Sequence, residues 1–311
     1  MMNEMMKRET AELLRKAMPE ASVRTDEKMS EHTTFRTGGP AAVFVEPASA
    51  EDIKSVIRIC RETGADHFVL GRGSNLLVSD SGYDGVVIHI ADSMSDIACY
   101  DDVIKAEAGA SLAAVAAAAR KNSLTGLEFA GGIPGSLGGG LRMNAGAYGG
   151  ELKDVLVSAV VMDKDGNISE QKREDLDMRY RGSRIADDDL IALSGVFRLH
   201  PGDITEITEY MQELAGKRRS RQPLEYPSAG STFKRPEGYF AGKLIEDAGL
   251  KGFRVGGACV SEKHCGFVVN DRNGTSQDVL AVMRAVREKV LSEYGVLLEP
   301  EVRFLGNGME I

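Results

Sequence analysis

A run of glycine between Gly131 and Gly150 constrains this chain more than any other part of its sequence. It reads GGIPGSLGGGLRMNAGAYGG and is the densest cluster of the 35 glycines in the chain. Glycine permits left-handed backbone conformations and close backbone contacts that a Cβ atom would prevent. Successive N–H groups in such a loop can bind an anion without a basic side chain. A second run, GRGSN at Gly71–Asn75, has the same character. Two such loops suit a ligand with two phosphate groups, and the length of the first favours a binding role over tight turns alone.

Two segments of the chain come near the most familiar nucleotide-binding motifs, but neither segment matches. The sequence GRGSNL begins like G-x-G-x-x-G, but Leu76 stands at the third glycine and an apolar strand follows instead of a helix. A Rossmann site needs that helix N-terminus for the pyrophosphate. The sequence GYFAGKL at Gly238–Leu244 is one residue short of a P-loop and lacks the Ser or Thr that would hold magnesium. The glycine runs therefore indicate a site of another kind.

Helical and strand patterns alternate along the chain and predict an α+β fold. The N-terminal stretch has the pattern of an amphipathic helix, Ser49 caps a helix that ends at Gly64, and Ser111 caps another. The composition of Asp165–Asn167 is that of a hairpin turn. Strands are predicted at residues 67–70, 86–90, 103–106, 155–163 and 190–199, after Asn75, and in the final LLEPEVRFLG segment.

Two more helices are predicted in the C-terminal third of the chain. Asp203 and Glu206 form a capping-box pattern at the start of the first. The second is predicted to start near Thr275 and to stop at Gly295. The residues expected to face inward are Ile204, Ile207, Met211 and Leu214 on the first helix, and Val279, Val282, Met283, Val286 and Val290 on the second.

The length of 311 residues exceeds what one compact core usually organises. We therefore predict an N-terminal helix and lead-in at residues 1–32, a first domain at 33–200 and a second at 201–311. The second domain would begin at Pro201 and Gly202, directly before the capping box.

Charge and composition exclude several classes of function. The net charge of −9 argues against nucleic acid as a partner, because phosphate binding needs a basic face. The longest apolar run, Ala108–Ala119, is too short to span a membrane. The N-terminus contains Glu4, Glu9 and Glu12 and lacks the apolar stretch of a signal peptide. We expect a cytoplasmic protein that binds neither nucleic acid nor membrane and has no obligate protein partner.

The cysteines show no pattern of a metal site or a disulfide framework. No C-x-x-C spacing occurs, and Cys259, His264 and Cys265 lack a fourth ligand at a usual spacing. We predict no metal, and free thiols in a reducing cytosol. The four cysteines are Cys60, Cys99, Cys259 and Cys265.

Seven motifs together resemble the UDP-N-acetylenolpyruvoylglucosamine reductase family. They follow the family's order between His32 and Gly306, and as a set they are highly specific. The motifs are HTTFRTGG, LGRGSNLLV, GGIPGSLGGGLRMNAGAYGGEL, YRGSR, SAGSTFKRP, GGACVSEKHCGFVVN and LEPEVRFLG. Their spacing is similar to that of the short form of the family, which lacks an extra substrate-covering loop. The resemblance implies a p-cresol-methylhydroxylase-type FAD-binding fold of two α+β subdomains at 33–200. It also implies a C-terminal α+β substrate-binding domain at 201–311, with the final strand returning towards the flavin.

The resemblance further implies non-covalent FAD and NADPH as the hydride donor. One side of the FAD pyrophosphate would contact Gly71, Arg72, Gly73, Ser74 and Asn75. The other side and the flavin edge would contact Ile133, Pro134, Gly138, Gly139, Asn144 and Gly146.

In the family, hydride passes from NADPH to FAD and then to the enolpyruvyl double bond of a UDP-sugar, giving UDP-N-acetylmuramate for peptidoglycan synthesis. Hydride addition pushes negative charge into the substrate carboxylate, and an arginine fork stabilises charge there. By its position in YRGSR, Arg181 is the predicted cation. Ser231 matches the family's proton donor, and a weak acid such as serine suits the protonation of a strongly basic carbanion.

Glu301 matches the family's catalytic acidic residue. It is expected on the polar face of the final strand with Glu299 and Arg303. Pro300 indicates an edge strand, from which Glu301 would reach a pocket. A surface ion pair with Arg303 is the alternative role for this carboxylate.

Other residues are candidates for contacts with the substrate. Arg218, Lys234 and Arg235 are candidates for the UDP phosphates, and Tyr148 for a phosphate or another part of the substrate. His264, in the V-S-x-x-H segment, is expected near the active site.

Two other functions are compatible with part of the pattern. An FAD-dependent oxidase of alcohols or sugars with the same fold would turn over oxygen and ignore NADPH. A non-enzymatic nucleotide-sugar-binding module would keep the glycine runs but would need no proton donor. Arg181, Ser231 and Glu301, each in its own motif, argue against the binding module.

Overall fold

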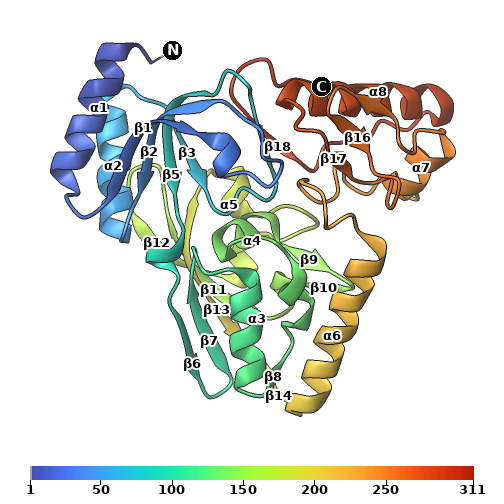
Figure 1. The fold of residues 1–311 in the computed structure, drawn as a ribbon. Coiled ribbons are helices and arrows are strands. Elements are labelled where there is room, and N and C mark those ends of the chain that lie inside the picture. The colour runs from blue at the N-terminus through green and yellow to red at the C-terminus, as the bar shows by residue number, and fades with distance from the viewer. Residues whose placement is uncertain (1) are drawn as a thin grey trace. The chain divides into compact units, whose positions relative to one another are not determined.

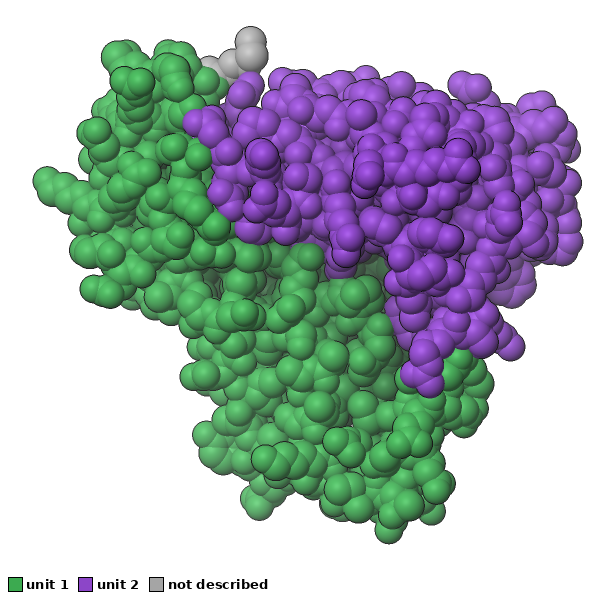
Figure 2. Space-filling model, in the orientation of Figure 1, with its two compact units in different colours: residues 1–25, 43–72, 85–217 green, residues 26–42, 73–84, 218–311 purple. Residues whose placement is uncertain are grey.

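The computed structural model describes residues 2–311 (Figure 1). The chain forms two compact units, each assembled from segments that are separated in the sequence (Figure 2). Unit 1 comprises the N-terminal segment up to Thr25, with Val43–Arg72 and Gly85–Lys217. Unit 2 comprises Asp26–Ala42, Gly73–Asp84 and Arg218–Ile311. The division at 1–32, 33–200 and 201–311 concerns functional domains and stays a prediction.

Helices and strands both occur throughout residues 2–311, which confirms the predicted α+β class (Figure 1). The helices are α1 (Glu4–Ala17), α2 (Ala50–Thr63), α3 (Leu112–Lys121), α4 (Leu137–Met143), α5 (Arg184–Asp187), α6 (Ile204–Arg221), α7 (Ala241–Asp247) and α8 (Ser276–Tyr294). The strands up to the middle of the chain are β1 (Ser22–Lys28), β2 (Pro40–Glu46), β3 (His67–Leu70), β4 (Leu76–Val78), β5 (Tyr83–His89), β6 (Ile97–Tyr100), β7 (Val103–Glu107), β8 (Leu124–Thr125), β9 (Gly146–Ala147) and β10 (Gly150–Glu151). The later strands are β11 (Leu156–Met162), β12 (Ile168–Lys172), β13 (Ile191–Arg198), β14 (His200–Pro201), β15 (Arg254–Val255), β16 (Ala258–Val260), β17 (Val268–Asn270) and β18 (Arg303–Leu305).

Two large clusters of buried residues lie against the two sheets in the described part of unit 1, and the first also takes in Met162 and Leu193 from the second sheet. The first sheet has the strand order β1-β2-β5-β3, and Leu14 of α1, Val56 of α2 and Val86 of β5 are buried in one cluster. The second sheet is antiparallel, with the order β12-β11-β13-β7-β6. Helices α3 and α4 pack on this second sheet, where Leu141 and Phe197 are buried. The second core therefore supports the glycine run that contains α4.

The predicted helix ends in unit 1 are confirmed. Ser49 Oγ accepts a hydrogen bond from Asp52 N at 3.1 Å, which satisfies one of the first N–H groups of α2. Gly64 ends α2 in the left-handed region, at φ 71°. Ser111 Oγ caps α3 in the same way, because it accepts a hydrogen bond from Ala114 N at 3.0 Å.

Unit 2 has one principal core between α8 and a small sheet. The sheet has the order β15-β16-β17, and α7 and α8 pack beside it (Figure 1). Strands β4 and β18 form a separate parallel pair, with Leu77 opposite Phe304. The predicted start and end of α8 are confirmed by the caps at Thr275 and Gly295. All predicted inward residues of α8 are fully buried: Val279, Val282, Met283, Val286 and Val290.

The predicted hairpin turn is also confirmed, but its second strand was not expected. Asp163 Oδ1 accepts hydrogen bonds from the N–H groups of Asp165 and Asn167 at 2.8 and 2.9 Å, and β12 follows. The sequence of β12, ISEQK, is polar and largely exposed at the edge of the sheet. It therefore lacks the apolar alternation by which a strand is found in a sequence.

Helix α6 begins as predicted, but one of the residues predicted to face the core is exposed to solvent. Asp203 Oδ1 accepts from Thr205 N at 2.7 Å and from Glu206 N at 3.2 Å. Ile207 and Leu214 are buried, whereas Ile204, predicted to face inward, is 45% exposed. Ile204 occupies the first turn of the helix, and the buried stripe starts one turn later. Up to Lys217 this helix belongs to unit 1. Among residues 2–311, no helix has the length and hydropathy needed to cross a membrane.

The N-terminal cap of α8 leads to a prediction about acid stability. Asp278 Oδ2 accepts from Thr275 N at 3.0 Å and from Gly257 N at 3.2 Å. These backbone N–H groups hold the pKa of the Asp278 carboxyl below its ordinary value, and the hydrogen bond from Thr275 N has the largest effect. Its contribution to stability is therefore complete above the ordinary pKa and is lost as the pH falls through the lowered one. We expect Asp278→Asn to lower the free energy of unfolding by about 1 kcal/mol at pH 7, and by less in acid.

The control for this measurement is Glu288→Gln, because Glu288 is an exposed carboxylate on the same helix. This control removes the same charge without removing a cap, and we expect it to change stability little. Denaturant unfolding of the three proteins between neutral and acid pH checks the prediction. An equal loss for Asp278→Asn at every pH would contradict the assigned cause.

Candidate active site

The long glycine run folds as a short helix and a hairpin on the second core of unit 1. Helix α4 occupies its centre, and β9 pairs antiparallel with β10 at its end. Gly138 N donates to Ala108 O at 2.8 Å, and Gly140 N donates to Ser136 O at 2.9 Å. These N–H groups are therefore used by the protein itself. Pro134 and Gly139, both predicted cofactor contacts, are exposed, and Ile133 is half-buried.

The two glycine runs meet within unit 1. A Cβ atom at Gly71 would lie 2.1 Å from Ser136 Oγ, so any larger residue there would require the Ser136 side chain to rotate away. Ser136 directly precedes α4, and it also bridges to Ser111 at the start of α3. Arg72, next to Gly71, is exposed and lies 3.3 Å from Asp92. Gly71 and the start of α4 thus lie side by side in unit 1.

The remainder of the GRGSN loop is held by unit 2. A Cβ atom at Gly73 would lie 1.9 Å from the carbonyl oxygen of His32, and Gly73 has φ 58°. Thr34 N donates to Gly73 O at 3.1 Å. The HTTFRTGG motif, to which the sequence alone assigned no role, therefore supports this loop. Asn75 Nδ2 donates to Glu301 O at 2.9 Å, which fixes the loop to the last strand segment.

Ser231 and Glu301 are brought together within unit 2 by backbone pairing. Glu301 N donates to Thr232 O at 2.9 Å, and Lys234 N donates to Glu299 O at 2.8 Å. Glu301 therefore lies beside the residue that follows Ser231. Ser231 is exposed and Glu301 is half-buried. The neighbouring carboxylate, Glu299, is paired with Lys234 Nζ at 3.0 Å.

Arg181 lies in unit 1, at the third position of a tight turn. Two hydrogen bonds close the turn. Arg179 N donates to Gly182 O at 3.0 Å, and Gly182 N donates to Arg179 O at 3.1 Å. Arg181 has φ 54°, which non-glycine residues rarely adopt. Its Nη2 donates to Gly146 O at 3.4 Å, and its guanidinium lies 5.0 Å from the centre of the Tyr180 ring. Arg181 thus reaches the hairpin at the end of the glycine run.

The other two arginines of the YRGSR motif are paired with carboxylates. Arg179 Nη2 lies 2.8 Å from both oxygens of Asp187, and this hydrogen bonding raises the pKa of the Arg179 guanidinium. Arg184 Nε donates to Asp188 at 2.7 Å. Both therefore have structural partners in unit 1, and Arg181 is the arginine of the motif that the turn presents beside the glycine run.

The predicted substrate residues lie in both units. Tyr148 is exposed at the tip of the β9–β10 hairpin of unit 1, with φ 53°. In unit 2, Arg218 is half-buried near the end of α6. Arg235 lies 4.0 Å from the centre of the Phe240 ring and donates from Nε to Tyr239 O at 3.3 Å.

His264 is held in a tight loop against α7. Its Nδ1 accepts from Gly266 N at 3.1 Å, and its ring lies 5.1 Å from that of Phe267. A Cβ atom at Gly242 of α7 would lie 3.2 Å from His264 Cε1. Burial lowers the pKa of His264, so the ring is neutral near pH 7. Its observed contacts are therefore those of a residue that shapes the loop.

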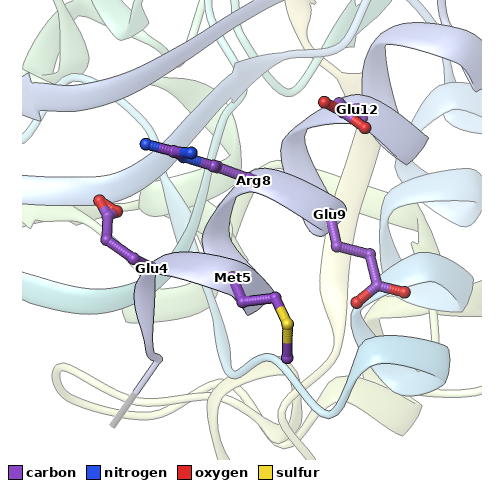
Figure 3. Close-up of a pocket in the computed structure, with 5 residues that line it drawn as sticks. All are labelled: Glu4, Met5, Arg8, Glu9 and Glu12. Atoms are coloured by element: carbon purple, nitrogen blue, oxygen red, sulfur yellow. The ribbon is translucent and has the colours of Figure 1, made fainter.

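A hollow on the molecular surface lies along α1 and is lined by one helix only (Figure 3). None of its residues belongs to the predicted site. They are Glu4, Met5, Arg8, Glu9 and Glu12.

Two family models and one distant structure define the class of protein. Residues 41–171 match an FAD-binding domain, and residues 222–305 match the UDP-N-acetylenolpyruvoylglucosamine reductase C-terminal domain. The structure of 4-ethylphenol oxidase from Gulosibacter chungangensis, at 16% identity, covers 99% of this chain and 68% of its own with a TM-score of 0.50. The protein is thus a flavoprotein of the p-cresol-methylhydroxylase-type fold, as predicted.

Closer relatives define the family. The UDP-N-acetylenolpyruvoylglucosamine reductase of Agathobacter rectalis is 52% identical over 301 residues, covering 93% of this chain and 96% of that protein. The protein of the same name from Clostridioides difficile is 46% identical, covering 91% and 93%. The crystal structure of the reductase from Thermus caldophilus is 34% identical, with a TM-score of 0.78 and coverage of 92% and 99%. The chain belongs to the UDP-N-acetylenolpyruvoylglucosamine reductase family. The predictions of the family, its short form and an FAD-containing oxidoreductase are confirmed.

The contact between Gly73 and His32 predicts the effect of one added methyl group. Gly308 is a suitable control, because it has φ 72° and nothing within 4 Å of an added Cβ. Gly308→Ala should destabilise by about 1–2 kcal/mol through the backbone alone. In Gly73→Ala the carbonyl of His32 must also move, so we expect a larger fall in the midpoint of thermal unfolding and a lower flavin content after purification. Equal shifts for the two variants would show that the close contact is unimportant.

Proposed function

We propose that this protein uses FAD and NADPH to reduce the enolpyruvyl double bond of UDP-N-acetylglucosamine enolpyruvate, giving UDP-N-acetylmuramate for peptidoglycan synthesis. The observation that carries the proposal is the 52% identity, over 93% of the chain, to a protein named for this substrate. The arrangement of the predicted residues within each unit supports it.

The cofactor proposal rests on the two glycine runs. FAD, when bound without a covalent link, would accept hydride from NADPH and deliver it to the double bond. On one side of its pyrophosphate the backbone of the GRGSN loop would approach closely, since Gly71 carries no side chain and Gly73 leaves no room for one. The residues proposed for this side are Gly71, Arg72, Gly73, Ser74 and Asn75. Those proposed for the other side and the flavin edge are Ile133, Pro134, Gly138, Gly139, Asn144 and Gly146.

Arg181 would bind the substrate carboxylate and stabilise the negative charge that hydride addition places there. A guanidinium suits this role because it meets both carboxylate oxygens at once. The positive φ of Arg181 supports the proposal, since strained residues occur preferentially at functional sites.

Ser231 would donate its hydroxyl proton to the carbanion, and Glu301 would assist at the same centre. The exposure of Ser231 leaves its hydroxyl accessible to a substrate. The backbone bond between Glu301 and Thr232 keeps the two side chains on neighbouring segments. A proton donor and a carboxylate held by main-chain bonds need little rearrangement during the reaction.

The UDP phosphates would be bound by Arg218, Lys234 and Arg235, with Tyr148 as a further substrate contact. Lys234 is paired with Glu299 in the protein alone. Such an exposed pair contributes only about 0–1 kcal/mol, so the ammonium group can exchange its carboxylate for a phosphate at little cost.

The proposal also covers domains and location. Residues 33–200 would bind FAD and 201–311 the UDP-sugar, with the final strand near the flavin. We place the reaction in the cytoplasm, where NADPH is available and free cysteines stay reduced. Burial raises the pKa of the Cys60 thiol to about 12, which makes this thiol unreactive.

The flavin proposal predicts a yellow protein that NADPH bleaches without oxygen. The absorbance of the purified protein, before and after anaerobic addition of NADPH, checks this. An oxidase of the same fold would instead be bleached by an alcohol or sugar and would ignore NADPH. A colourless protein that FAD does not reconstitute would contradict both flavin-dependent functions.

The proton-donor proposal predicts a selective defect in one half-reaction. Ser231→Ala should slow reoxidation of the reduced protein by the enolpyruvyl substrate by about 10²–10⁴-fold, the usual contribution of a general acid. Reduction by NADPH should be nearly unchanged, because no proton is delivered to substrate in that step. Stopped-flow absorbance of each half-reaction measures both rates. The control is Ser169→Ala, on exposed strand β12. Equal slowing of both half-reactions by Ser231→Ala would mean that Ser231 is structural.

A further inference from the structure

We propose that Asn144 is a positioning residue for Arg181, and that it acts by holding the turn and the hairpin between which the guanidinium lies. This inference rests on the proposed function, because it gives Arg181 the carboxylate-binding role. It assigns to Asn144 a part that is different from direct contact with the flavin.

The Asn144 side chain is fully used by the protein. It is 0% exposed. Its Nδ2 donates to Glu151 Oε2 at 3.1 Å and to Arg179 O at 3.2 Å, and its Oδ1 accepts from Lys153 N at 3.0 Å. Both N–H groups of the amide are thus committed. A side chain buried in this way can influence a ligand through the groups that it holds.

The first of these groups is the turn that carries Arg181. Arg179 O closes the turn by accepting from Gly182 N, and the same oxygen accepts from the Asn144 amide. The Arg179 side chain is itself anchored on Asp187. The backbone before Arg181 is therefore fixed at its carbonyl and through its side chain, and the strained φ of Arg181 is maintained by these contacts.

The second group is the hairpin that the guanidinium touches. Glu151 of β10 pairs with Gly146 of β9. Gly146 O accepts from Arg181 Nη2, and the Glu151 carboxylate accepts from Asn144. Asn144 thus links the turn from which the Arg181 side chain extends to the β9–β10 strand pair that the Arg181 guanidinium contacts.

The backbone of Asn144 provides a way to test the amide alone. Asn144 ends α4 in the left-handed region, at φ 43°. Asparagine tolerates this region better than most residues, and glycine tolerates it without strain. Asn144→Gly therefore keeps the conformation and removes the three side-chain hydrogen bonds. Asn273→Gly is the matched control, because Asn273 has φ 51° in a loop of unit 2.

We expect Asn144→Gly to slow reoxidation by the enolpyruvyl substrate by about 10–10²-fold, since an error near 1 Å in a positioned group has effects of that order. The rate of reduction by NADPH should fall by a smaller factor than the rate of reoxidation, because Arg181 would act on the enolpyruvyl substrate alone. The affinity of the oxidised protein for UDP-N-acetylmuramate, measured by calorimetry, should fall by a similar factor, because Arg181 would bind the product carboxylate too. Asn273→Gly should change none of these.

A double-mutant cycle with Arg181→Ala separates positioning from general damage. If Asn144 acts through Arg181, adding Asn144→Gly to Arg181→Ala should change the reoxidation rate and the product Kd by less than about threefold. If the two substitutions act independently, so that their separate factors multiply in the double variant, the inference is wrong and the role of Arg181 stands. A wild-type rate for Arg181→Ala would instead overturn the proposed function of Arg181.

Glu151→Gln provides a second route if Asn144→Gly purifies without flavin. It keeps the shape of the acceptor and removes the charge that strengthens the bond to Asn144. We expect Glu151→Gln to slow reoxidation by a smaller factor than Asn144→Gly does. The inference is supported if Glu151→Gln slows the wild-type protein in this way but not the Arg181→Ala variant. Multiplicative effects in this second cycle overturn it just as those in the first cycle would.

Discussion

The absence of a Cβ atom at two positions governs how this site is built. At Gly71 the missing atom leaves room for Ser136 Oγ, and at Gly73 it leaves room for the carbonyl of His32. At Gly73, where the neighbour is a backbone carbonyl, the loop can approach its support this closely only as bare backbone. Its other attachments, from Thr34 to Gly73 and from Asn75 to Glu301, depend on that approach. Glycine here is a packing requirement in addition to a conformational one.

Much of the fold could be predicted because the relevant signals are local. Ser49, Gly64, Thr275 and Gly295 mark helix ends through hydrogen bonds made within a few residues. The same reasoning fails where context decides. The polar strand β12 is held by pairing with β11, and α4 forms inside a glycine-rich stretch because Leu137 and Leu141 are buried on the second core. Propensity alone does not indicate either element.

The candidate site divides in a similar way. Motifs identified the segments that contain Arg181, Ser231 and Glu301, but charge and spacing alone do not distinguish Arg181 from its neighbours in YRGSR. The family resemblance selected Arg181 by its place in the motif, and the structure adds that Asp187 and Asp188, eight and four residues further along the chain, pair with Arg179 and Arg184. The role inferred for Asn144 was equally hidden, because it depends on a carbonyl 35 residues further along the chain.

The bond between Asn75 and Glu301 joins residues that are 226 positions apart. During synthesis from the N-terminus, the loop that begins at Gly73 therefore emerges long before the segment that fastens it, and so do HTTFRTGG and β4. Contacts of such separation form late and slowly. A ribosome must translate as far as Glu301 before this part of unit 2 can close, so a product that stopped after α8 would lack the segment that completes the loop.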